Sequence, residues 1–376
     1  MSLSPINPRS KPVFKIGAHD DQEKFQPLPL PTDLYPYHLD LKTVLPNLPE
    51  NKMVFHMAGD TGGLVSPVFK HQVANQMIGQ FAQARLPEDS PQFFFHLGDV
   101  VYNFGQADEY YPQFFEPYAH YPAPIFAIAG NHDADLNPSD PKHPNSLDAF
   151  IKVFCDTQSQ PIAFAGDSGR NSNTQPNVYW TLNTPLADII ALYSNVPRFG
   201  TITAVQKKWF VEELKIAAVN KGEKALIICL HHVPYSADTN HGSSTHMQQF
   251  INSAFEEANV FPDIVFSGHV HNYQRFSKHY DNGKNLPFIV AGAGGFADLH
   301  KIAQPRDPEF PDTSKLLDNV HLLSYCDRTH GFLKITIEKT EERFALDGAY
   351  YTIPPIGDNS SPATVYDRFT VKIGDY

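Results

Sequence analysis

Short apolar segments recur along this sequence, and each is followed by side chains that can bind a cation. Residues 52–57, 93–97 and 124–129 have the length and the aromatic or branched content of buried strands. Residues 225–230 and 262–266 are of the same kind. The side chains that follow the five segments are Asp60; Asp99; Asn131 and His132; His231 and His232; and His269 and His271. Because ligands of α/β sheets bind beyond the carboxyl ends of the strands, we expect these side chains to meet in one place.

The segments between and after these strands predict the rest of the architecture. Apolar residues at helical spacing predict helices over 67–86, 204–219 and 244–258, and strands dominate from residue 331 onward. Alternating strands and helices followed by a run of strands predict an α/β fold. We expect a sandwich of two mixed sheets with helices on the outside.

The same pattern predicts a simple domain organisation. Residues 1–50 hold many prolines and little periodicity, and we interpret them as an extended N-terminal segment packed on the domain. Residues 51–376 are interpreted as a single domain. The polar stretch 134–177 is expected to be a long insertion that contains a short helix at 147–154.

The composition narrows the classes of partner and of location. A formal net charge of −12, a pI near 5.8 and the lack of a basic run argue against binding to nucleic acid or to a membrane surface. No apolar stretch approaches the roughly 20 residues of a transmembrane helix. Three scattered cysteines do not form a disulfide framework. The N-terminus shows no signal peptide, so the compartment stays open: cytoplasmic by default, and periplasmic or secreted if a leader has been removed.

Each polar loop is a weak signal when it is taken alone. Asp60 and Asp99 could be ordinary turn or N-cap carboxylates, and a chain with 18 histidines produces some close pairs by chance. Unrelated turns would not each supply an oxygen or nitrogen donor directly after a strand. The joint pattern therefore favours one metal site.

Five blocks of the sequence resemble those of the calcineurin-like metallophosphoesterases, and within them those of the purple acid phosphatase-like branch. The resemblance covers roughly residues 52–350. The blocks, in order, are Gly59-Asp60-Thr61-Gly62, Gly98-Asp99-Val100-Val101-Tyr102, Gly130-Asn131-His132-Asp133, His232-Val233-Pro234-Tyr235 and Gly268-His269-Val270-His271.

The resemblance implies a four-layer α/β/β/α sandwich that holds two metal ions. By motif position, the first ion would bind Asp60, Asp99, Tyr102 and His271, and the second would bind Asp99, Asn131, His232 and His269. Asp99 would bridge the two. His232 fits the family spacing before Pro234 better than His231 does, and His231 is expected to lie behind the ligands.

Two features favour the purple acid phosphatase-like branch. Many metallophosphoesterases have Asp-x-His in the first block, whereas this chain has Asp60-Thr61-Gly62. Tyr102 offers a phenolate instead, a hard anionic donor that suits Fe(III), while imidazole suits divalent ions. We expect Fe(III) at the Tyr102 site and Fe(II), Zn or Mn at the other; the alternative for Tyr102 is aromatic packing at the sheet edge.

The expected activity is that of an acid phosphatase acting on phosphomonoesters by metal-hydroxide attack. Two cations offset the repulsion between phosphate and hydroxide and lower the pKa of bound water. His132 is the best general acid or phosphate donor, because it neighbours the ligand Asn131 and is not expected to share its metal. His241, nine residues after His232, lies where the family places histidines of the substrate loop; it could instead be a solvated loop residue. Arg275 is expected in a structural ion pair.

Three alternatives stay open. The chain could be a divalent-metal phosphodiesterase of the same superfamily that acts on cyclic nucleotides or other diesters. It could be a non-catalytic scaffold on the same fold, although such proteins typically lose ligands and all are present here. It could also serve metal storage or redox chemistry, which would not require His132. The partner in the favoured case is a small phosphate ester, with its identity and the oligomeric state left open.

Overall fold

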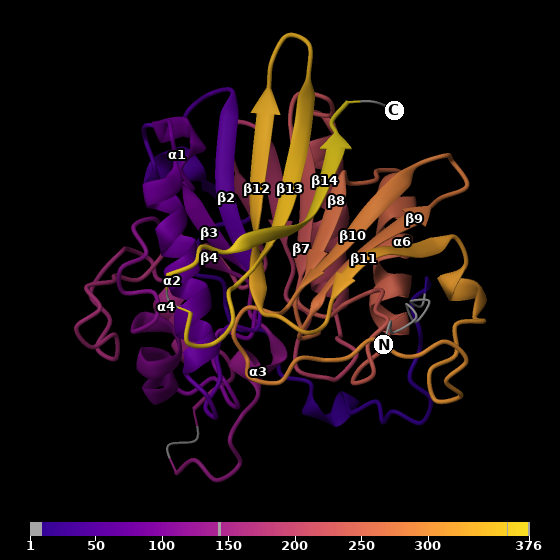
Figure 1. The fold of residues 1–376 in the computed structure, drawn as a ribbon, viewed down its shortest axis with the longest axis horizontal. Helices are drawn as coiled ribbons and strands as arrows, with labels where there is room; N and C mark the ends of the chain where they lie inside the picture. The colour runs from indigo at the N-terminus through magenta and orange to yellow at the C-terminus, as the bar shows by residue number, and fades with distance from the viewer. Residues whose placement is uncertain (1–9, 142–143, 359, 375–376) are drawn as a thin grey trace.

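The computed structural model describes residues 10–141, 144–358 and 360–374, and within these ranges two β-sheets lie face to face (Figure 1). One sheet has six strands in the order β14-β13-β12-β2-β3-β4, and the other has eight in the order β1-β5-β6-β7-β8-β10-β9-β11. Both contain parallel and antiparallel neighbours. The predicted pair of mixed sheets is therefore confirmed.

The strands of the six-stranded sheet are β2 (Lys52–Ala58), β3 (Phe93–His96), β4 (Ile125–Ala127), β12 (Gly331–Lys339), β13 (Phe344–Thr352) and β14 (Thr364–Lys372). Those of the eight-stranded sheet are β1 (His38–Asp40), β5 (Trp180–Asn183), β6 (Ala187–Ala191), β7 (Ala225–Leu230), β8 (Ile264–Ser267), β9 (Tyr273–His279), β10 (Asn285–Ala291) and β11 (Val320–Cys326). The α-helices are α1 (Leu41–Val44), α2 (Val68–Gln83), α3 (Asn131–Ala134), α4 (Asp148–Phe154), α5 (Ala204–Ala218) and α6 (Thr245–Ala258).

The inner core lies between the two sheets and is built by the two-residue alternation of side chains along each strand. In β3, Phe93 and Phe95 face the other sheet, whereas Phe94 faces outward. Phe93 stacks on Phe55 of β2 with 4.7 Å between the ring centroids. Outward-facing residues pack against helices, with Val73 of α2 among those that cover the six-stranded sheet. The predicted four-layer sandwich is confirmed.

The outer helix layer of the eight-stranded sheet is formed by α5 and α6. Trp209 and Leu214 of α5 are buried with outward-facing residues of β6 and β7. Both helices begin with a side-chain cap, Thr203 accepting from the backbone N–H of Gln206 and Ser244 from that of Met247. No helix in the described ranges has the length and apolar character needed to span a bilayer.

Three strands of the eight-stranded sheet, β1, β9 and β11, were not predicted from the sequence. β1 comes from the N-terminal segment and pairs with β5, while β9 and β11 pair with each other beyond β10. The helix expected at 147–154 is present as α4. The division of the chain at residue 50 stays a prediction. The first nine residues, where no leader was recognised, and residues 142–143 of the insertion lie outside the described ranges.

Parallel pairing brings the ligand-bearing loops to one edge of the sandwich. β2, β3 and β4 are mutually parallel, and so are β6, β7 and β8, so the carboxyl ends within each set lie side by side. The short helix α3, which follows β4 and begins at Asn131, lies at the lower edge of the sheets in Figure 1. The loops after β2, β3, β4, β7 and β8 meet at this edge.

Candidate metal centre

Three predicted ligands of the first ion form a compact group, called here the first donor group: Asp60, Tyr102 and His271. The Tyr102 Oη atom lies 3.1 Å from Asp60 Oδ1 and 3.2 Å from His271 Nε2, and the last two atoms are 3.5 Å apart. Donor atoms bound to one ion at about 2.0–2.2 Å lie about 2.8–3.6 Å from each other, the shorter values in octahedral and the longer in tetrahedral coordination. His271 Nδ1 donates to the Asp298 carbonyl at 3.1 Å, which leaves the Nε2 lone pair for the centre.

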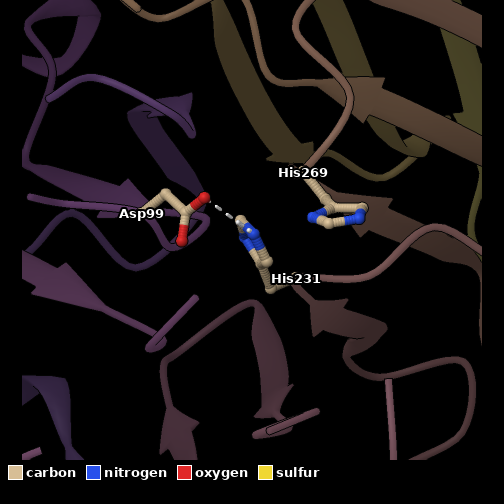
Figure 2. A group of neighbouring side chains, drawn as sticks. All are labelled: Asp99, His231 and His269. Carbon is tan, nitrogen blue, oxygen red and sulfur yellow. Dashed lines mark ion pairs between the residues drawn. The ribbon is translucent and has the colours of Figure 1, made fainter. Parts of the chain in front are cut away.

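Beside it lies the second donor group, which contains Asp99, Asn131, His231 and His269. Asn131 Oδ1 lies 3.0 Å from His269 Nδ1 and 3.2 Å from His231 Nε2, and His231 Nε2 lies 3.3 Å from Asp99 Oδ2. Figure 2 shows the His231 ring between the Asp99 carboxylate and the His269 ring. Asp99, His231 and His269 each direct one donor atom into a space in which these atoms lie within 4.8 Å of one another, which makes them a possible metal-binding cluster.

His232 approaches the second donor group from another side. Its Nδ1 lies 2.8 Å from Ser194 Oγ, and its ring centroid is 4.3 Å from that of His269. The Nε2 atoms of His232 and His269 are buried, and no described residue gives either a hydrogen-bond partner. A buried polar atom without a partner is unfavourable, and a cation would satisfy His232 Nε2, while His269 can offer one of its two ring nitrogens. The residues present therefore fit a metal centre.

The backbone around the centre is held in uncommon conformations. Asp60, Asp99 and His269 have φ values of 58°, 54° and 66°, in the left-handed region. This region costs non-glycine residues on the order of 1–3 kcal/mol and is concentrated at functional sites. At Gly130 a Cβ atom would lie 2.1 Å from Asp99 Oδ1, so only glycine allows Asp99 its position.

Burial and charge shift the pKa values of the groups around Asp99. Burial raises the pKa of the Asp99 carboxyl, but the neighbouring His231 and His132 outweigh it and hold that pKa below its usual range. Burial lowers the pKa of His231, but Asp99 and Asp60 raise it to about 9. The Tyr102 pKa is raised well above 10 by burial and by the same two carboxylates, so a cation is needed to hold a phenolate there.

Asp133 forms hydrogen bonds to both the Asp99 loop and the Asn131 loop. Its buried carboxylate accepts hydrogen bonds from the backbone N–H groups of Val100, Val101 and Gly130 at 3.0, 3.1 and 2.9 Å. Burial and the charge of Asp99 raise the pKa of Asp133 to about 7. The Asp99 loop and the Asn131 loop are therefore fixed relative to each other.

The two predicted catalytic histidines are only half-buried, unlike the predicted ligands Asp60 and Asp99. His132 Nδ1 donates to the Asn103 carbonyl at 2.7 Å, and its ring lies 4.4 Å from that of Tyr102. The His241 ring lies 4.2 Å from that of His269. Burial lowers the pKa of His241 to about 3, although Asp238 opposes this shift. The structure thus brings His132 and His241 to the two donor groups.

Two further side chains at the centre were missed by the sequence analysis. The fully buried Asp238 accepts hydrogen bonds from the backbone N–H groups of Asn240, His241 and Gly242 at 2.9, 3.0 and 2.8 Å. His300 stacks on His271 with 4.2 Å between centroids, and its Nδ1 lies 3.3 Å from Asp238 Oδ2. Asp238 could have been suspected from its polar loop beside His241; no sequence signal marked His300.

Two other polar residues, Arg275 and His56, lie elsewhere. Arg275 forms the expected ion pair, with its Nε 2.7 Å from Asp367 Oδ2. His56 is buried between Tyr121 and Gln80. Neither takes part in the two donor groups.

The sandwich and the clustered donors define a metallophosphoesterase. Residues 53–273 match the calcineurin-like phosphoesterase family, and the chain belongs to that family. Within it the chain is similar to purple acid phosphatases. It is 24% identical over 330 residues to purple acid phosphatase 23 of Arabidopsis thaliana, covering 82% of this chain and 63% of that protein. It is 27% identical over 191 residues to purple acid phosphatase 15 of the same plant, covering 49% and 32%. The chain therefore spans less than two thirds of the length of these relatives.

Two solved structures share the fold. GAP50, described as the anchor in the inner membrane complex of Plasmodium, aligns with a TM-score of 0.55 at 14% identity over 86% of this chain and 89% of that chain. PhoD aligns with a TM-score of 0.52 at 14% identity over 92% and 71%. At this identity the likeness concerns the fold alone.

Proposed function

We propose that this chain is a dinuclear-metal acid phosphatase that hydrolyses small phosphomonoesters. The observation that carries the proposal is the first donor group, in which a buried tyrosine oxygen stands 3.1 Å from Asp60 and 3.2 Å from His271. A phenolate together with a carboxylate is a hard, anionic donor set, and such a set favours a trivalent ion such as Fe(III). The second donor group is richer in imidazole and suits Fe(II), Zn or Mn.

The proposed ligands of the first ion are Asp60, Asp99, Tyr102 and His271, and those of the second are Asp99, Asn131, His232 and His269. Two cations bound there would attract the phosphoryl oxygens and lower the pKa of water, so that a nucleophile forms at modest pH. Asp99 is the proposed bridge, because its Oδ2 lies 3.3 Å from His231 Nε2 in the second donor group and its carboxylate helps to raise the pKa of Tyr102 in the first.

His132 and His241 are the proposed catalytic residues, since they are less buried than the predicted histidine ligands and lie beside the two donor groups. The His132 Nδ1 proton is engaged by the Asn103 carbonyl, so Nε2 is the atom that can carry a proton to the leaving alcohol. The His241 ring lies against His269 and is held by the Asp238 loop, which suits it to donate a hydrogen bond to a phosphoryl oxygen.

A monoester preference follows from charge. A monoester dianion brings two negative charges and benefits most from a trivalent–divalent pair, whereas a diester brings one and needs room for a second substituent. The experiment compares kcat/KM for p-nitrophenyl phosphate and bis-p-nitrophenyl phosphate at pH 5 and pH 8, with iron and zinc restored. We expect the monoester to be favoured, with the higher rate at pH 5.

The alternatives are distinct outcomes of the same assay. A preference for the diester at pH 8 would identify a divalent-metal phosphodiesterase. No turnover of either ester by protein that contains two metal ions would identify a non-catalytic scaffold.

A further inference from the structure

His231 reaches the centre from inside the sandwich. In β7, Ala225, Ile227 and Cys229 belong to the core between the sheets, and the intervening residues face the outer layer. Because side chains alternate along a strand, His231 continues the inner series and His232 the outer one. Their ring centroids are 5.4 Å apart with the planes at 89°. The two neighbouring histidines therefore approach the second donor group from different sides.

The backbone leaves room for the His231 ring. A Cβ atom at position 98 would lie 2.6 Å from His231 Nδ1, so the ring fits only because residue 98 is a glycine. The ring is fully buried, and its Nδ1 lies 2.8 Å from the carbonyl oxygen of Leu97. A carbonyl can only accept, so Nδ1 carries a proton, and Nε2 is the nitrogen that can bind an ion once it has released its own proton.

The His231 Nε2 atom faces two acceptor oxygens. His231 Nε2 lies 3.3 Å from Asp99 Oδ2 and 3.2 Å from Asn131 Oδ1. Asn131 would present the same Oδ1 atom to a bound ion. A proton on Nε2 holds these atoms together in the metal-free chain, and a metal ion could take its place, because donors bound to one ion at about 2.0–2.2 Å lie about 2.8–3.6 Å apart.

We propose that His231 is a direct ligand of the second metal ion, in addition to His232. The proposal rests on the proposed dinuclear centre and adds to it an imidazole that the sequence motifs did not assign. The second ion would then have three imidazoles, from His231, His232 and His269. Such a set favours zinc or another ion that prefers nitrogen ligands over manganese, which prefers oxygen.

The test measures binding of Co²⁺ to the metal-free chain of residues 1–376 and the visible absorption of each bound equivalent. The variants are His231→Gln, His232→Gln and, as a matched control, His56→Gln, which changes an equally buried histidine outside the centre. We expect the second equivalent to bind more than about 100-fold more weakly to His231→Gln, beyond the 10- to 100-fold typical of a residue that only orients a ligand. Its absorption spectrum should also change, and His56→Gln should match the wild type.

The outcomes separate this proposal from the proposed function. Wild-type protein that binds fewer than two ions would overturn both. The His231 proposal alone would be overturned if the wild type binds two ions and His231→Gln binds the second ion with the wild-type affinity and spectrum. It would also be overturned if His231→Gln loses less than about 100-fold in affinity and its spectrum is unchanged. If His231→Gln does not fold, a crystal structure of the zinc-loaded wild type decides the matter. A His231 Nε2–zinc distance of about 2.0–2.1 Å supports the proposal, and one beyond about 3 Å contradicts it.

Discussion

Replacing Asp238 with asparagine should loosen the loop that carries His241. Oδ2 of this buried carboxylate accepts from the N–H groups of Asn240 and His241, and Oδ1 accepts from Gly242 N–H and, at 2.8 Å, from the Ser236 hydroxyl. An asparagine keeps one acceptor oxygen, and its NH₂ group faces the remaining donors. Two hydrogen bonds are lost and their donors are left without an acceptor, at about 1–3 kcal/mol each, so we expect a loss of about 2–6 kcal/mol in the free energy of unfolding.

The assay pairs urea unfolding with steady-state kinetics on a phosphomonoester. If the loop positions His241 for substrate, kcat/KM should fall by about 10- to 100-fold while both metal ions are retained, since small misplacements have effects of this size. Asp188→Asn is the control, because Asp188 is also buried and meets Lys224 at 2.9 Å, but it lies outside the two donor groups. The control should lose stability without losing activity. An Asp238→Asn enzyme with normal kcat/KM would refute the positioning role, and one with unchanged stability would refute the hydrogen-bond argument.

Three further predictions concern colour, protonation and acid stability. Tyr102→Phe should bleach the colour that Fe(III)-phenolate charge transfer gives the oxidised protein; visible spectra of both proteins check this, and a colourless active wild type would contradict it. His132→Ala should lower kcat about 10²- to 10⁴-fold on esters with high-pKa leaving groups and much less on p-nitrophenyl phosphate; equal losses would indicate phosphate binding instead. Burial lowers the pKa of His56 to about 3, so the unfolded chain takes up more protons as pH falls below about 6.5. Between pH 7.5 and pH 5 the free energy of unfolding, measured with urea, should therefore fall by about 2 kcal/mol less in His56→Gln than in the wild type.

The elements that the sequence predicted are those in which one local segment carries the whole signal. Asp60 and Asp99 each follow an apolar strand and a glycine, so their place at a strand end could be inferred without knowledge of any partner. Parallel pairing of β2, β3 and β4 then brings such ends together. The same reasoning missed β9, because Arg275, Lys278 and His279 interrupt its apolar pattern.

Contacts between loops that are far apart in the chain could not be predicted from the sequence. His300 reaches His271 and Asp238 across 29 and 62 positions, and nothing near residue 300 marks it. The adjacency of His231 and His232 was visible, but their different directions were not used. The space that Gly98 leaves for the His231 ring depends on how two strands of different sheets approach each other.

Metal analysis of the purified chain tests the central claim most directly. Elemental mass spectrometry after exhaustive loading with iron and zinc should find two ions per chain in the wild type. Asp99→Ala should retain at most one, because Asp99 is the carboxylate proposed to bridge both sites. A wild-type protein that binds no ion or one, or an Asp99→Ala protein that keeps two, would contradict the dinuclear centre on which the proposed activity depends.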